Sequence, residues 1–439
     1  MKAVLSLAVP TVISQMITVF YNMTDTFFIG QLNDPKQVAA ATVAMPLFMI
    51  LTAVANLFGI GGSSLISRCL GAGDREKAKQ TSAFCIWSAA VTALIYGMLL
   101  FLFRPVILPM LGARQDTYNY TYSYVLWTVT IGGIPSVLNY SLAHLVRAEG
   151  CSKEASLGVA GSGILNMLLD PLFIFVFKMN IVGAAMATML SNAAAVVYFF
   201  LLLRSRKDTT VLTADPLYFT LRQHIPMEVL AVGLPSFLIS LMATVSNSAL
   251  NSMIASASTE AVAGMGIAKK INMMAFAVAQ GITQGSLPLI GFNYSAGNRK
   301  RMRSAVKTVL FLGIGVAAVL TSCLYGFASA VTSGFIDDAE TISYAQQFLR
   351  IICFACPSTT ISFLLITVFQ AVGKKLQPAI LSCLRKGLLD IPLMYAFRPH
   401  WGLKGVAWAT PVADISAVLI SAFIFLPFWK KLTAAQIEK

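Results

Sequence analysis

Long apolar runs separated by short polar or basic segments fill the whole chain. Each run has roughly 20 to 30 residues, enough for a helix to cross about 30 Å of hydrocarbon. Six runs fall in each half of the sequence, at residues 5–30, 39–68, 79–103, 121–147, 155–177 and 182–204, then 228–256, 262–291, 302–330, 342–370, 377–397 and 403–429. The pattern predicts an all-α membrane protein with twelve transmembrane helices.

Composition and charge agree with this class. The chain has 57% hydrophobic and 11% charged residues and a mean hydropathy of +0.75, which excludes a soluble globule with a polar surface. Its net charge of +14 comes mainly from lysines and arginines in segments that would face one side, such as 204–207, 299–307 and 374–375. This positive-inside bias predicts a multi-pass protein of the cell membrane with both termini cytoplasmic. It also accounts for the charge without a nucleic-acid partner.

The two halves of the sequence repeat each other at a nearly constant offset. Pro10 and Asn22 match Pro235 and Asn247 at an offset of 225. Three short stretches recur at offsets of 224, 222 and 220: AGDR at 72–75 as AGNR at 296–299, GAAMAT at 183–188 as GVAWAT at 405–410, and LLD at 168–170 as LLD at 388–390. Several matches at similar offsets indicate an ancestral duplication.

Because each repeat contains six spans, both begin and end on the same side of the membrane, so they are parallel repeats. We expect a six-helix lobe at 1–207, a cytoplasmic linker at 208–227 and a second six-helix lobe at 228–439, with the lobes facing a central cavity. The polar loop at 71–74 is expected to form a turn, with glycine allowing a positive φ, before the next helix starts.

The sequence lacks the usual catalytic patterns. It has no phosphate-binding GxxxxGK[ST] loop, no GxSxG elbow, and three separated histidines without a ligand pattern. We therefore expect neither an enzyme nor a cofactor.

Acidic residues inside the predicted spans are the strongest candidates for chemistry. Asp25, Asp170, Asp390 and Asp414 lie in apolar runs, where a charge costs about 2.5–3.5 kcal/mol on insertion scales. Asn166 precedes Asp170 by one helical turn, and Thr188 begins the sixth span at a similar depth to Asp25 and Asp170. These oxygens predict a relay for H⁺, or a metal site if the ion is Na⁺: Asp25, Asn166, Asp170 and Thr188.

Structural interpretations compete with the functional one. Asp170 precedes Pro171 and could simply end a helix, and Asp25 could be a snorkelled or hydrogen-bonded acid. Asp390 lies about one turn from Arg385 and Lys386, so an ion pair is an alternative there. Further candidates for substrate contact or conformational change are Tyr21, Pro10, Asn22, Asn247, Gln280 and Lys269.

Several motifs together resemble the multidrug and toxic compound extrusion (MATE) transporters. They are Pro10 with YN at 21–22 and DTxFIG at 25–30, GAGD at 71–74, LNxxxD at 165–170, GFNY at 291–294 and FQAxGK at 369–374. The resemblance is strongest to the DinF-type branch. It implies that the amino-terminal lobe holds the cation site at Asp25, Asn166, Asp170 and Thr188, and that Pro10 is the kink point of the first helix.

The same resemblance implies a secondary antiporter that exports bulky amphipathic, often cationic, drugs in exchange for H⁺ or Na⁺ by alternating access. The alternative is a lipid or polysaccharide flippase of the same superfamily, which would need a more cationic cavity than these arginine-poor spans provide. Expected partners are small drug-like molecules and the bilayer, with the protein as a monomer.

Overall fold

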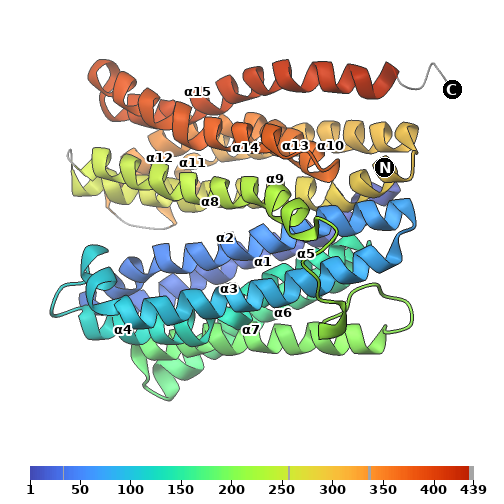
Figure 1. The fold of residues 1–439 in the computed structure, drawn as a ribbon. Coiled ribbons are helices and arrows are strands. Elements are labelled where there is room, and N and C mark those ends of the chain that lie inside the picture. The colour runs from blue at the N-terminus through green and yellow to red at the C-terminus, as the bar shows by residue number, and fades with distance from the viewer. Residues whose placement is uncertain (33, 256–257, 335–337, 435–439) are drawn as a thin grey trace. The chain divides into compact units, whose positions relative to one another are not determined.

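The computed structural model describes residues 1–32, 34–255, 258–334 and 338–434, and helices account for nearly all of them. In chain order the helices are α1 (Lys2–Gly30), α2 (Pro35–Ala72), α3 (Arg75–Met110), α4 (Tyr118–Val125), η1 (Leu126–Ile131), α5 (Gly133–Ala148), α6 (Ser152–Pro171), η2 (Leu172–Val176), α7 (Asn180–Ser205), η3 (Pro216–Tyr218), α8 (Ile225–Ala255), α9 (Thr259–Ser295), α10 (Arg299–Gly326), α11 (Ala328–Ser333), α12 (Ala339–Ile352), α13 (Ala355–Ala371), α14 (Leu376–Cys383), η4 (Leu384–Leu389) and α15 (Asp390–Ala434). Figure 1 shows their order along the chain. No strand occurs in the described ranges.

The predicted twelve-span fold is confirmed. Nine helical segments among the described residues are long and apolar enough to cross a membrane, and two bent pairs, α4–η1 with α5 (47°) and α12 with α13 (44°), each supply one more span. The last of the nine, Leu376–Lys431, has 56 residues and breaks at Gly402, where φ is 58°. A helix that long is more than twice the hydrocarbon thickness, so it contains the last two predicted spans.

Packing divides the chain into two compact units. We call Ile13–Ser240 the amino-terminal unit and Met1–Val12 with Leu241–Lys439 the carboxy-terminal unit. The divisions therefore fall inside α1 and α8. The six-helix lobes predicted at 1–207 and 228–439 remain a prediction.

In the amino-terminal unit, α2 packs against α3 and α5, and α7 packs against α5 and α6 (Figure 1). Leu51 and Phe58 of α2, Phe84 of α3 and Leu142 of α5 are buried together in its core. The connection after α7 belongs to the same unit, since Glu149 accepts hydrogen bonds from Thr210 Oγ1 (2.7 Å) and the Val211 backbone (2.6 Å).

In the carboxy-terminal unit, α9 packs against α10, α12 and α13, and α15 packs against α12 and α13 (Figure 1). Its largest cluster of buried apolar side chains joins Leu250 of α8, Phe348 of α12, and Met394 and Val406 of α15. At Gly402 the backbone leaves helical geometry (φ 58°, ψ −139°), so α15 consists of two helical arms joined at a kink.

Matching turns confirm the duplication at the level of backbone geometry. Gly73 (φ 80°) precedes Asp74, which caps α3 by accepting from Lys77 N, and Gly297 (φ 73°) precedes Asn298, which caps α10 by accepting from Arg301 N. The glycines lie in the left-handed region, which L side chains rarely adopt. The turn predicted at 71–74 is thus present in both repeats.

Candidate functional site

Three helices of the amino-terminal unit carry the predicted ion-site residues. Asp25 lies on α1, Asn166 and Asp170 lie on α6, and Thr188 lies on α7. Gly163, one turn before Asn166, lets α6 approach α1 closely, because a Cβ there would lie 3.0 Å from Ile17 Cγ2 and 3.4 Å from the Tyr21 ring. The small residue thus brings the polar face of α6 next to α1.

The Asn166 amide bridges Asp170 and Thr188. With the amide turned so that both partners are satisfied, its nitrogen donates to Asp170 Oδ2 at 3.3 Å, and its oxygen accepts from the backbone N (3.1 Å) and Oγ1 (3.3 Å) of Thr188. All three residues are buried, with Asp170 0% exposed. The structure therefore brings three of the four predicted ion-site residues into one hydrogen-bonded group, and their role in ion binding remains a prediction.

Asp25 is less fully partnered than Asp170. Its Oδ1 is buried and has no hydrogen-bond partner among the described residues. Asp25 and Asp170 are close enough to interact electrostatically. Tyr124 is also close enough to interact electrostatically with each of these two acids. A buried carboxylate oxygen without a donor is unfavourable unless a proton or a cation joins it. The arrangement is therefore suited to holding a small positive ion.

A buried polar network beside this cluster was missed by sequence reasoning. Asn139 of α5 donates to Ser162 Oγ (3.1 Å) and to Asn192 Oδ1 (2.8 Å), and Asn192 in turn donates to the Thr188 carbonyl (2.8 Å). The available signal was an asparagine inside an apolar span, with Asn192 one helical turn after Thr188. The network holds α5, α6 and α7 together behind the ion-site residues.

The remaining predicted residues separate between the units. Tyr21 lies in the same unit as the ion-site residues, and its hydroxyl lies 3.3 Å from that of Tyr140. Asn22 instead donates to the Thr18 carbonyl of its own helix (2.8 Å). Pro10, Asn247, Gln280 and Lys269 belong to the carboxy-terminal unit.

Among those residues of the carboxy-terminal unit, Lys269 donates to Asn251 Oδ1 at 3.3 Å, and Asn247 is exposed. The role of these residues in substrate contact or conformational change remains a prediction.

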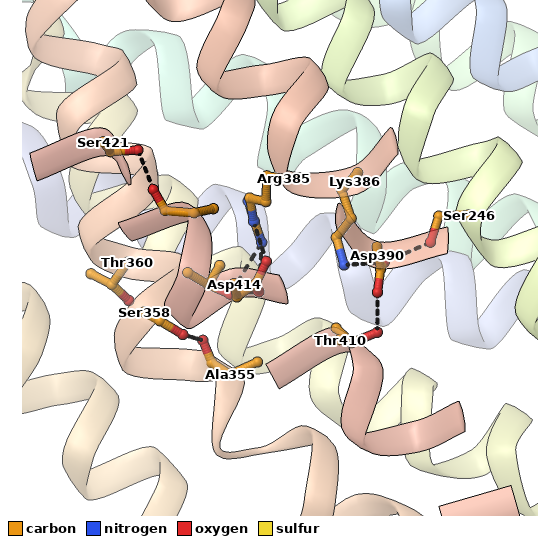
Figure 2. Close-up of polar contacts among 12 residues, drawn as sticks. Ser246, Ala355, Ser358, Thr360, Arg385, Lys386, Asp390, Thr410, Asp414 and Ser421 are labelled. Atoms are coloured by element: carbon orange, nitrogen blue, oxygen red, sulfur yellow. Dashed lines mark hydrogen bonds and ion pairs between the residues drawn. The ribbon is translucent and has the colours of Figure 1, made fainter. Parts of the chain in front are cut away.

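The other two acids of the predicted spans are buried, and each forms an ion pair in the carboxy-terminal unit (Figure 2). Asp390 pairs with Lys386 one turn earlier (3.3 Å), which confirms the ion-pair alternative for that acid. Arg385 points instead to Asp414, with Nε 2.7 Å from Asp414 Oδ1. Neighbours in sequence thus bind different acids, because successive side chains of a helix point in different directions around its axis.

Gly183 controls how α7 packs beside the site. A Cβ there would lie 2.8 Å from the backbone carbon and 2.9 Å from the oxygen of Phe173, and backbone atoms cannot rotate away. We expect Gly183→Ala to lower the free energy of unfolding by about 1–3 kcal/mol through overpacking. Thermal unfolding in detergent measures this. Gly161→Ala is the control, since nothing lies within 4 Å of its Cβ; equal losses in both variants would contradict the packing argument.

Comparison with known proteins agrees with the fold and the duplication. The MatE family model matches residues 10–172 and again residues 235–396. The chain belongs to the MATE family. The two matches start 225 residues apart, which confirms the internal repeat predicted from the sequence.

This MATE protein is similar over its whole length to multidrug exporters. It is 30% identical over 438 residues to the multidrug export protein MepA of Staphylococcus aureus and 28% identical over 437 residues to that of Staphylococcus saprophyticus; each alignment covers 100% of this chain and 96% of the relative. A solved outward-facing multidrug resistance MATE transporter of the MOP superfamily aligns with a TM-score of 0.90 and 25% identity, covering 99% and 96% of the chains. The protein is accordingly a membrane transporter, and neither an enzyme nor dependent on an organic cofactor. Its placement in the DinF-type branch stays a prediction.

Proposed function

We propose that this MATE transporter is an antiporter that exports amphipathic, often cationic, drugs in exchange for H⁺ or Na⁺. In this proposal Asp25, Asn166, Asp170 and Thr188 hold the exchanged ion, and the lobes at 1–207 and 228–439, joined by the linker at 208–227, alternate access around the substrate. The protein works as a monomer in the cell membrane with both termini in the cytoplasm.

The observation that carries this proposal is the incomplete hydrogen bonding of Asp25. Its buried Oδ1 has no donor within the described part of the chain, although Asp170 nearby accepts from Asn166, which in turn bonds to Thr188. Two neighbouring carboxylates at membrane depth are mutually unfavourable until a positive ion neutralises one of them. The multidrug export assigned to the MepA relatives supports drugs as the other cargo.

Everted membrane vesicles test the coupling directly, because their cytoplasmic face is turned outward and export becomes uptake. We expect a cationic dye to accumulate when the lumen is acidic or rich in Na⁺, and the gradient that drives it identifies the ion. Dissipating that gradient with an ionophore should stop uptake. Dye accumulation that ignores both gradients would reject the antiport proposal.

Binding to the purified protein tests whether drug and ion oppose each other. Antiport requires that the two cargoes weaken each other's binding, and this coupling is reciprocal. We therefore expect the ion to lower the affinity of the purified protein for the dye by the same factor as the dye lowers the affinity for the ion. Fluorescence titration of the dye with and without the ion measures the effect.

A further inference from the structure

The carboxy-terminal unit contains a structural counterpart of the proposed ion site. The repeat offset of 220 that aligns Asp170 with Asp390 also aligns Asn166 with Lys386, and the neighbouring offset of 222 aligns Thr188 with Thr410. The triad of amide, carboxylate and hydroxyl in the first repeat therefore becomes ammonium, carboxylate and hydroxyl in the second.

In both triads the residue one turn before the aspartate donates to it, but Thr188 bonds to Asn166, whereas Thr410 donates to Asp390 itself. Asp390 accepts from Lys386 Nζ (3.3 Å) and from Thr410 Oγ1 (3.0 Å), as Figure 2 shows. Asp170 and Asp390 are both 0% exposed, and the leucines two residues before them, Leu168 and Leu388, are both 66% exposed. The same helical face is thus turned inward in both repeats.

The two sites differ in how their charge is balanced. In the amino-terminal unit Asp25 adds a second carboxylate. The offset of 225 that aligns Asn22 with Asn247 makes Leu250 the equivalent of Asp25 in the second repeat, so no second carboxylate is present there. In the carboxy-terminal unit Asp390 is fully partnered, since Ser246 Oγ of α8 also donates to it at 2.6 Å (Figure 2). The site of the amino-terminal unit therefore carries an excess of negative charge, whereas in the carboxy-terminal unit the Lys386 ammonium neutralises Asp390.

We propose that Asp390, Thr410 and Ser246 form a second, duplicated site for a small monovalent cation, and that the Lys386 ammonium permanently occupies it as a tethered ion. The inference rests on the proposed ion site of the amino-terminal unit. An ammonium group, a dehydrated Na⁺ and a proton can each neutralise the same carboxylate and be bound by the same carboxylate and hydroxyl oxygens. Ion exchange is consequently confined to the amino-terminal unit, and removal of the tether should open the second site.

Lys386→Asn tests the proposal, because it restores the residue found at the equivalent position of the first repeat. The variant is made in an Asp25→Asn background, which disables the proposed first site. Binding of radioactive Na⁺ and uptake of protons after a pH step are counted on the purified protein. We expect Asp25→Asn to bind fewer ion equivalents than the unsubstituted protein and the double variant to regain one.

Two controls separate a reopened site from a general disturbance. Asp25→Asn with Lys386→Arg keeps a tethered cation, so it should regain nothing. Adding Asp390→Asn to the double variant should remove the regained ion. The thermal midpoint of the double variant should also rise with ion concentration, because a bound ion stabilises only the folded protein. A double variant that gains no ion, or an arginine variant that gains as much, would overturn the inference.

The reverse substitution keeps the test valid if Lys386→Asn impairs folding. Asn166→Lys places a tethered ammonium one turn from Asp170, as Lys386 lies from Asp390. We expect this variant to fold and to bind the exchanged ion at least about tenfold more weakly, the value of one charged hydrogen bond. Unweakened ion binding here contradicts the tether, whereas unweakened binding in Asp25→Asn alone contradicts the proposed function instead.

Discussion

Replacing Asp25 with Asn is expected to abolish ion-driven drug transport while leaving the protein folded. The substitution keeps the shape of the side chain but removes the charge that attracts the ion into a buried site. Losing one charged interaction of this kind weakens ion binding by roughly a hundredfold. Dye uptake into everted vesicles under the effective gradient should then fall to the passive leak, as measured by fluorescence quenching.

An acid outside the spans provides the matched control for this result. Asp116 is exposed in the connection between α3 and α4, so Asp116→Asn changes the net charge by the same amount without touching the site. It should transport dye at the rate of the unsubstituted protein. Ion-driven uptake that persists in Asp25→Asn would show that Asp25 is not part of the exchange.

Replacing Arg385 with Met is expected to cause the largest loss of stability of any substitution considered. The guanidinium forms two bonds with Asp414, from Nε to Oδ1 (2.7 Å) and from Nη2 to Oδ2 (3.2 Å), and also donates to Thr359 (3.1 Å). The side chains of the pair are only 3% and 1% exposed. Removing one partner leaves a buried, uncompensated charge, which costs about 3–5 kcal/mol.

Thermal unfolding in detergent measures that loss, and two further variants interpret it. Arg385→Met with Asp414→Leu removes both charges, so it should recover most of the stability. Glu154→Gln breaks the Arg206–Glu154 pair, whose side chains are 40% and 26% exposed, and should cost less than about 1 kcal/mol. A loss from Arg385→Met as small as that of the exposed pair would mean that the buried pair does not hold the unit together.

Part of the ion site could be read from the sequence because its geometry is local. Asn166 and Asp170 are four residues apart on one helix, so they had to share a face wherever the helix packed. The Lys386–Asp390 pair follows the same rule. Thr188 and Asp25 are different, because their nearness to Asp170 depends on how α1, α6 and α7 meet. From the sequence they were grouped with Asp170 only by a similar depth in the spans and by the resemblance to a known family.

Other contacts had no local signal. Arg385 lies only one residue farther from Asp390 in sequence than Lys386 does, yet it bonds to Asp414, 29 residues away, because its side chain leaves the helix on another face. The Asn139–Asn192 bond joins residues 53 apart on α5 and α7. Neither pairing follows from spacing along one helix.

The sequence by itself determined the twelve spans, their division into two repeats and the glycine turns, since each depends on hydrophobic length, on self-similarity or on a backbone angle that few residues adopt. Only the tertiary structure decided which acids are neutralised by the protein's own cations and which are not. Asp390 and Asp414 each have a basic partner, whereas Asp25 has a buried oxygen without a donor among the described residues. The physical reason is that charge compensation in a membrane depends on which side chains of separate helices come within bonding distance.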